Sequence, residues 1–570
     1  MRKLPRILTV LLILFAVSSS VAESPVSTPK TPDYWPTEGW RASTPEEQGM
    51  DSELLARAIG FVRERNLNVH SLLVIRNGYI VADAYFYPFS RGSKHDIASV
   101  TKSFTSTLIG IAIDKGHIKS VNQPVLEFFP QRTVANLDEN KKGMTLEDLL
   151  TMSSGLACIS DSREVTLSQM MASPDWVQFM LDLPMSDKPG TRFVYNSGGS
   201  HLLSAIIRES TGMNELAFAE KHLFGPLGIS DVIWPLDPQG VNNRGWGDLR
   251  VTPHDMAKLG YLYLNEGRWD GKQIVSAQWV AAATSKQIRS RLPGHNRYGY
   301  QWWIRSSGNG YSAVGRGGQR VFVLPDKKMV VVTTSGIGGD AGHTQLERLL
   351  QSFIIPAAKS SKFLQPNPTG VALLESRIRQ AALSRSQPRP APPLPQIAAK
   401  VSGQTYVMDA NSSGLVSCSL TFRSQEEAVL GVSIVEDSQT LELRVGLNNV
   451  YRISPGRFGL PAAARGFWQT DNVFALDLDE AGNINRWRIL MTFRDDRVTV
   501  VLNEATALTS AIVGGKAQTD LLSEELGTPN KDTILGAISL GRLDKTSTFF
   551  AWVSERKKES HANNGADCTP

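Results

Sequence analysis

The chain contains little cysteine: only Cys158, Cys418 and Cys568 occur among its 570 residues. Thiols this far apart exclude a cysteine metal cluster and argue against a disulfide scaffold, although one bridge between two of them stays open. None of its nine histidines forms an H-E-x-x-H zinc pattern. A Walker loop and a G-x-S-x-G nucleophile elbow are also absent. The sequence therefore gives no reason to expect a metal or another cofactor.

Charge of one sign is equally scarce. The formal net charge is only +5, and lysine and arginine are dispersed along the chain. The one dense basic cluster, residues 556–558, lies in a polar tail beside Glu555 and Glu559. This distribution predicts no nucleic-acid partner. A content of 41% hydrophobic and 20% charged residues is typical of a soluble globular protein, and the length predicts more than one domain.

The N-terminus lacks an apolar run long enough for a membrane anchor. Residues 7–17 are apolar, which is shorter than the ~20 residues that a spanning helix needs. They follow the cationic residues 1–6 and precede the small residues 20–22, which is the pattern of a secretory signal peptide. No cysteine follows the predicted cleavage site, so a lipoprotein anchor is not supported. We therefore expect an exported protein, periplasmic or extracellular after cleavage, without a stable membrane anchor.

The most informative motif that is present is a serine followed three residues later by lysine, Ser99 and Lys102. Apolar side chains recur at helical spacing after it, at Phe104, Leu108 and Ile111. Residues three apart share one helix face, so the lysine Nζ can reach the serine Oγ. Burial lowers the pKa of a lysine, and its neutral amine can then act as a base. This predicts Ser99 as nucleophile, Lys102 as its base, and the Ser99 N–H at the helix N-terminus as an oxyanion donor.

The S-x-x-K pattern alone is weak, because about one or two chance matches are expected in a chain of this length. A tyrosine segment strengthens it. Residues 189–199 form a turn and a short apolar approach that place Tyr195 before a glycine pair and a helical run. A tyrosine at the lip of a cleft can serve as a second acid or base when a cation lowers its pKa. Lys102 is the expected cation.

A glycine-rich segment supplies the next candidate residues. Residues 313–325 predict a bend that enters a strand, and residues 328–334 predict its antiparallel partner. Gly317 and Gly318 present no side chains at this strand edge, so a substrate acyl group can lie against the backbone there. The Gln319 N–H is the expected second oxyanion donor.

With these segments, residues 45–356 resemble the serine β-lactamase and penicillin-binding-protein superfamily. They are most similar to its class C-like branch, which includes D-alanyl-D-alanine carboxypeptidases, carboxylesterases and 6-aminohexanoate-dimer hydrolases. Further segments at residues 149–156, 251–260 and 298–303 follow in the family's order. The resemblance implies an α/β (α+β) fold, with a β-lactamase-like sheet flanked by helices and an all-helical subdomain. It also implies an acyl-enzyme on Ser99, with Lys102 or Tyr195 as the acylation base and Tyr195 as proton shuttle to the leaving group.

Two departures from the family pattern concern substrate binding. Ser197 stands where the family usually has the asparagine of Tyr-x-Asn, and its side chain reaches less far. Arg316 stands at the lysine or histidine position before Gly317 and Gly318. It can hold a substrate carboxylate with two bonds, or it can be a solvated cation at the cleft rim. We expect these four residues to contribute to substrate binding. Loss of the lysine favours a general amide or ester hydrolase over a dedicated β-lactamase.

The chain changes character after the predicted hydrolase domain. A proline-rich run at residues 384–395 predicts a semi-rigid spacer. Alternating runs follow, and residues 487–493 and 498–502 predict an antiparallel hairpin in a β-barrel-like domain. The predicted parts are a signal peptide (1–22), an N-terminal linker (23–44), a serine hydrolase domain (45–358), a Pro-rich linker (359–396), a small β-barrel or lipocalin-like domain (397–516) and a partly disordered tail (517–570).

These features predict an exported serine hydrolase that cleaves an amide or ester bond in a small-molecule or peptide-like substrate. One alternative is a peptidoglycan D,D-carboxypeptidase or β-lactamase. Another is a non-catalytic, penicillin-recognising binder or sensor. The loops at residues 158–174 and 242–250 are expected to form the pocket, but their sequence does not identify the acyl or leaving group. The oligomeric state is not predicted.

Overall fold

The computed structural model describes residues 34–159, 164–292, 295–305, 310–409, 414–434, 440–504 and 546–553, and Tyr34–Pro570 form one compact unit. The predicted signal peptide lies outside the described residues. No helix within those ranges combines the length and the apolar character that a membrane span requires.

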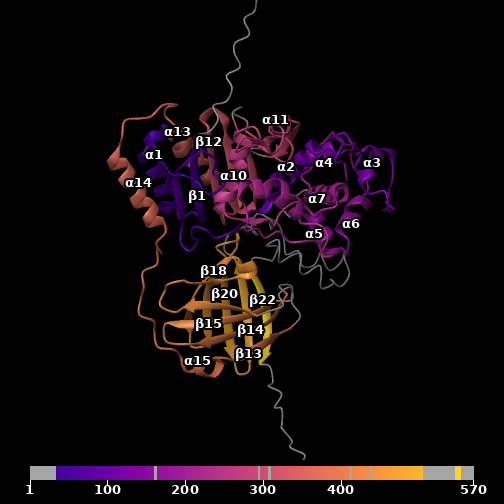
Figure 1. Ribbon diagram of the computed structural model, residues 1–570. Coiled ribbons are helices and arrows are strands. Elements are labelled where there is room, and N and C mark those ends of the chain that lie inside the picture. Colours follow the sequence, from indigo (N-terminus) through magenta and orange to yellow (C-terminus); the bar gives the residue numbers. More distant parts are fainter. Residues whose placement is uncertain are drawn as a thin grey trace, which may run out of the picture. The chain divides into compact units, whose positions relative to one another are not determined.

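An eight-stranded antiparallel sheet organises the N-terminal part, with strand order β2-β1-β12-β11-β10-β9-β8-β7. Figure 1 labels its strands β1 and β12. In this order the strands are β2 (Tyr79–Tyr85), β1 (Val69–Arg76), β12 (Met329–Ser335), β11 (Gln319–Leu324), β10 (Tyr311–Gly315), β9 (Trp303–Ile304), β8 (His295–Tyr298) and β7 (Ile288–Leu292). The predicted pairing of the glycine-rich bend with the strand after it is confirmed, because β11 pairs with β12 from Arg320↔Thr333 to Leu324↔Met329.

Helices cover both faces of this sheet, which explains why every residue of β1 is buried. Leu72 and Val74 pack in a core with α1 (Ser52–Glu64) and α14 (Pro368–Ala381), whereas Leu73 and Ile75 pack on the other face, where α10 (Pro253–Leu264) lies. Successive strand residues point to opposite faces, so a strand covered on both sides becomes continuously apolar.

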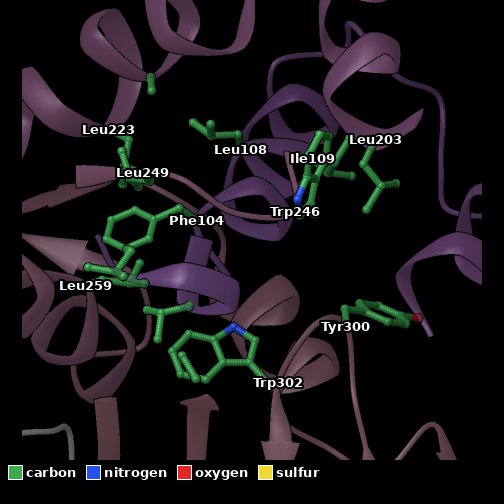
Figure 2. Packing of buried hydrophobic residues seen from close by; sticks show 14 of the residues in the cluster. Phe104, Leu108, Ile109, Leu203, Leu223, Trp246, Leu249, Leu259, Tyr300 and Trp302 are labelled. Atoms are coloured by element: carbon green, nitrogen blue, oxygen red, sulfur yellow. The ribbon is translucent and has the colours of Figure 1, made fainter. Parts of the chain in front are cut away.

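Helix α2 (Thr101–Asp114), which follows Ser99, is buried along almost its whole length. Phe104 and Leu108 point into a core that includes Leu249, Leu259 and Trp302 (Figure 2). A short strand, β3 (His95–Asp96), precedes α2 and pairs with β4 (Arg250–Val251). The core around α2 therefore holds the segment that contains Ser99 in one position.

A group of helices forms the predicted helical subdomain beside the sheet (Figure 1). Its members are α3 (Glu139–Gly143), α4 (Leu146–Leu150), α5 (Val165–Ala172), α6 (Trp176–Asp182) and α7 (Ser197–Thr211). Helix α7 begins at an asparagine cap, because Asn196 Oδ1 accepts the Gly199 N–H at 3.1 Å. This cap fixes the chain direction directly after Tyr195.

The C-terminal part is a ten-stranded sheet with order β16-β15-β14-β13-β22-β21-β20-β19-β18-β17, which a further β16–β18 pairing nearly closes into a barrel. Its strands are β13 (Thr405–Met408), β14 (Leu415–Phe422), β15 (Glu427–Ile434), β16 (Leu441–Gly446), β17 (Arg452–Pro455), β18 (Pro461–Thr470), β19 (Val473–Asp479), β20 (Arg486–Arg494), β21 (Arg497–Glu504) and β22 (Thr546–Val553). The predicted hairpin is β20–β21. The predicted fold class, including this barrel, is confirmed.

Two segments differ from the predicted division of the chain. Helix α14 lies in the predicted linker, yet its Leu374 and Ala381 are buried in the core that α1 shares with the first sheet. Strand β22 lies in the predicted tail, where it pairs with both β13 and β21. Without β22 those two strands would expose unpaired edges, so this segment completes the sheet.

Candidate active site

Ser99 lies on a tight turn at the start of α2. The turn is a 3-10 segment over 98–100, and Ala98 has φ of 47°, which residues with a side chain rarely adopt. The Asp96 carboxylate accepts the Ala98 N–H at 2.8 Å, and Thr101 Oγ1 donates to the Ala98 carbonyl at 2.6 Å. Strain that neighbouring groups hold in place is typical of functional sites. The turn leaves the Ser99 side chain only half-buried.

Lys102 is placed to contact the serine, as the helical spacing predicts. Its Nζ lies 3.1 Å from Ser99 Oγ, 3.1 Å from Ser197 Oγ and 2.8 Å from the carbonyl oxygen of Trp246. The side chain is 1% exposed, and burial lowers the pKa of this lysine to about 8. A lysine with this pKa has a substantial neutral fraction near neutral pH, which a base requires.

Tyr195 completes a three-residue cluster. Its phenol lies close enough to Ser99 for that residue to act against the rise of the phenol pKa. The Tyr195 ring stacks on Trp303, and its centroid lies 5.0 Å from Lys102 Nζ. The expectation that Lys102 lowers the pKa of this tyrosine is wrong. Burial and the nearby Glu164 carboxylate raise that pKa well above its usual value. The phenol therefore stays protonated at neutral pH.

Ser197 links the cluster to an acid that the sequence did not single out. It is the first residue of α7, and its hydroxyl donates to Glu164 Oε2 at 2.5 Å while it contacts Lys102. The Glu164 charge raises the pKa of Lys102 against the larger effect of burial. The structure thus gives Ser197 a contact to the lysine, and its role in substrate binding stays a prediction.

Arg316 lies in the same pocket as Ser99. Burial lowers its pKa, and the carboxylates of Asp96, Glu164 and Asp248 oppose that shift. A guanidinium that is half-buried among three acids is a pocket residue rather than a fully solvated cation at the rim. Whether it binds a substrate carboxylate stays a prediction.

Gly317 and Gly318 lie in the turn between β10 and β11, with φ of 79° and 90°. A β-carbon built on Gly317 would lie 2.3 Å from Ile484 Cγ2, and one on Gly318 would lie 2.3 Å from Ser335 Oγ. Both positions need glycine for their conformation and for space. The contact of these glycines with a substrate acyl group stays a prediction.

Gln319, the predicted second oxyanion donor, is fully buried. Its side-chain amide donates to the Ser335 carbonyl at 2.6 Å and accepts the Ser335 N–H at 3.0 Å, which fixes the start of β11 against β12. The preceding strand ends beside the nucleophile, because a β-carbon on Gly315 would lie 3.1 Å from the Ser99 amide nitrogen. The β10–β11 hairpin therefore borders the Ser99 N–H, and the role of the Gln319 N–H stays a prediction.

A cavity of about 50 Å³ lies over Ser99. Both loops expected to form the pocket contribute to it, and Asn483 and Ile484 come from the C-terminal barrel.

The pocket residues that the sequence did not single out are Glu164, Trp246, Asp96 and Asp248. Trp246 acts through its backbone carbonyl, which no sequence pattern marks, and the acids gain their roles only from tertiary contacts. Within the described ranges, no group of three or more acidic, histidine or cysteine side chains is placed to hold a metal ion.

Comparison with known proteins identifies the family. The sequence profile of the family described as Beta-lactamase matches residues 54–351, just over half of the chain. The chain belongs to the beta-lactamase family. The predicted resemblance is thereby confirmed, and the matched residues contain the whole Ser99, Lys102 and Tyr195 cluster.

Relatives of this beta-lactamase family member include hydrolases. The 6-aminohexanoate-dimer hydrolase of Paenarthrobacter ureafaciens is 25% identical over 315 residues, which are 51% of this chain and 79% of that protein. The octameric penicillin-binding protein homologue from Pyrococcus abyssi is 18% identical, with a TM-score of 0.42 over 78% of this chain and 97% of that one. A family VIII carboxylesterase is 17% identical, with a TM-score of 0.42 over 59% and 98%.

Proposed function

We propose that this protein is an exported serine hydrolase that cleaves amide or ester bonds through an acyl-enzyme on Ser99. The observation that carries the proposal is the 3.1 Å contact between Lys102 Nζ and Ser99 Oγ, with Tyr195 near the same serine. A nucleophile that contacts both a base and an acid has the arrangement that acyl transfer needs. The cationic and apolar N-terminal residues 1–22 support export.

The two candidate bases differ in how the site changes their pKa. Burial lowers the pKa of Lys102 to about 8, whereas it raises that of Tyr195. Lys102 is therefore the base that accepts the Ser99 proton during attack on the carbonyl carbon. Tyr195 is the acid that protonates the leaving amine or alcohol, and it is reprotonated at the expense of the Lys102 ammonium, which holds the proton taken from Ser99. The Ser99 N–H at the start of α2 stabilises the oxyanion, and water then releases the acyl group.

Relatives suggest the substrate class. One relative is named a 6-aminohexanoate-dimer hydrolase, which supports linear amides as substrates here as well. Arg316 in place of the family's lysine or histidine favours a general amide or ester hydrolase over a dedicated β-lactamase. The rival activities are a D,D-carboxypeptidase, a β-lactamase and a silent binder that acylates without turnover.

A substrate panel with detection of the covalent intermediate tests the proposal. Purified protein is supplied with short p-nitrophenyl esters, linear amides, D-amino-acid amides and a chromogenic cephalosporin, and intact mass is recorded after rapid acid quench. We expect steady turnover of esters or linear amides and an acyl mass increment on the Ser99 peptide. Preferred turnover of the cephalosporin or of D-amino-acid amides would favour the family's other activities, and a burst without turnover would favour the silent binder.

The rate should depend on pH through Lys102. Only the neutral amine accepts the Ser99 proton, so kcat/KM for a p-nitrophenyl ester is expected to rise with pH through a midpoint of about 8. Glu164 raises the pKa of Lys102, so Glu164→Gln should move this midpoint to lower pH. Initial rates across the pH range measure both midpoints. A wild-type profile that is flat around the expected midpoint would exclude Lys102 as the titrating base.

Tyr195→Phe separates the leaving-group step from the attack. Loss of a general acid typically costs about 10²- to 10⁴-fold in rate. An amine must be protonated to leave, whereas nitrophenolate leaves as a stable anion. We therefore expect kcat for amide substrates to fall much more than kcat for p-nitrophenyl esters. Parallel kinetics on one amide and one ester with the same acyl group make the comparison, and equal losses would argue that Tyr195 only positions Ser99.

A further inference from the structure

The C-terminal barrel encloses a cavity of about 200 Å³ whose wall is mainly apolar. Strands β15, β16, β20 and β21 line it with Leu430, Val432, Leu443, Ile489, Met491 and Leu502. Alternate residues of a barrel strand point inward, so this wall is formed by every second residue of β20. A barrel interior of this kind is suited to hold one small apolar ligand or chain.

This barrel cavity adjoins the Ser99 pocket. The linings of the two share Asp96, Asp248 and Asn483. Asp96 is also the residue whose carboxylate holds the turn before Ser99. The end of the barrel cavity that these three polar residues line therefore lies beside Ser99. A substrate acyl chain bound in the cavity would reach Ser99 from that end.

The loop between β19 and β20 holds the mouth of the barrel, the end that borders the Ser99 pocket, against the segment before Ser99. The Gly482 carbonyl accepts the Asp96 N–H at 2.8 Å. Ala481 is fully buried in the core that surrounds α2, and Ile484 lies against Gly317. These contacts join the barrel loop to the segment before Ser99, to the core around α2 and to the turn before β11. They therefore hold the two cavities next to each other.

A buried arginine at the mouth carries donors for a ligand. Arg250 is 4% exposed, and its Nε and Nη1 have no hydrogen-bond partner among the described residues. Its guanidinium lies 3.9 Å from the Phe458 ring centroid, and its Nη2 lies 3.6 Å from Asp96 Oδ2. Because buried N–H groups are rarely left unpaired, this residue favours a ligand with acceptor oxygens near the barrel mouth.

We propose that the barrel cavity binds the aliphatic acyl chain of the substrate, with the carbonyl end of that chain toward Arg250 and Ser99. The inference rests on the proposed hydrolase function and names its substrate class, amides or esters of longer aliphatic acids. The acyl side is assigned because Tyr195, which serves the leaving group, packs on Trp303 of the first sheet and not on the barrel. The chemistry at Ser99 is unchanged, and the barrel contributes binding.

A chain-length series measures this binding. With p-nitrophenyl esters from acetate to decanoate, kcat/KM is expected to rise by up to about fourfold per methylene, the gain from burying one CH₂. Ile489→Trp fills the cavity and should reduce kcat/KM at least about tenfold more for the octanoate than for the acetate. Leu490→Trp, which places the same side chain on the opposite face of β20, is the matched control. A flat series in the wild type, or equal losses in both variants, would overturn the inference.

A direct measurement of ligand binding separates the proposed acyl-chain site from catalysis and from any folding defect of the Trp variants. Decanoate is titrated calorimetrically into full-length Ser99→Ala, with and without Ile489→Trp. We expect binding to Ser99→Ala that the second substitution weakens at least about tenfold. Decanoate binding together with no hydrolysis of any ester would refute the proposed function and leave the apolar site standing. Rapid ester hydrolysis with no decanoate binding and no chain-length effect would refute the apolar site alone.

Discussion

Ser99→Ala is expected to abolish covalent labelling by an active-site phosphonate and to reduce kcat by about 10⁶-fold, the usual effect of removing a serine nucleophile. The reason is local: Lys102 Nζ lies 3.1 Å from the Ser99 hydroxyl and Tyr195 lies near it, and neither is a substitute nucleophile there. Labelling is read by intact mass, and turnover by release of p-nitrophenol.

The control is Ser90, a second serine nine residues before Ser99. It is exposed, and within the part of the chain that the structure describes its hydroxyl contacts that of Ser93. Ser90→Ala should therefore keep full labelling and full turnover. Phosphonate labelling that persists in Ser99→Ala would show that another residue is the nucleophile.

The local part of this site could be predicted from the sequence. Three-residue spacing on a helix is a geometric rule, so Ser99 and Lys102 were expected to touch, and their heteroatoms lie 3.1 Å apart. The β20–β21 hairpin follows equally from alternation and a short turn. Such features depend on residues close in the chain, where period and turn chemistry are decisive.

The pKa shift of Tyr195 could not be predicted from the sequence, because it depends on which distant residues pack around that side chain. The sequence predicted that Lys102 would lower the pKa of Tyr195. The structure instead buries the tyrosine and places Glu164 nearby, and both raise that pKa. Glu164 is brought to Ser197 from a separate loop, and nothing in its own neighbourhood predicts that contact.

The outer contacts of the barrel were missed for the same reason. The loop over 480–485 has an ordinary turn composition, and only the fold places its Gly482 carbonyl on the Asp96 N–H. Strand β22 is separated from β21 by a long connection, so its pairing is also non-local. Sequence patterns predict that strands exist far better than they predict which distant segments complete a sheet.

Lys102→Met is the second change with a large expected effect. It removes the base but keeps a buried chain of similar length, and kcat/KM should fall by about 10²- to 10⁴-fold. Residual activity should lose the rise around pH 8 that the wild type shows. Lys102→Arg is the matched cation: it preserves the charge but cannot give up a proton, so it should be as inactive as methionine. An arginine variant with near wild-type rates would mean that Lys102 supplies charge and not proton transfer.

The pH dependence of folding stability tests the lowered pKa of Lys102 without relying on catalysis. Burial lowers the Lys102 pKa from 10.5 to about 8, so between these pH values the unfolded chain binds more protons than the folded one. The free energy of unfolding of the wild type therefore rises with pH across this window, by about 3 kcal/mol from this group, and Lys102→Met lacks the contribution. Urea titrations of both proteins from about pH 7.5 to about pH 10 give the difference, in which other titrating groups cancel. A difference that does not change with pH would mean that burial does not lower the pKa of Lys102. The side chain would then stay charged at neutral pH and could not act as the proposed base.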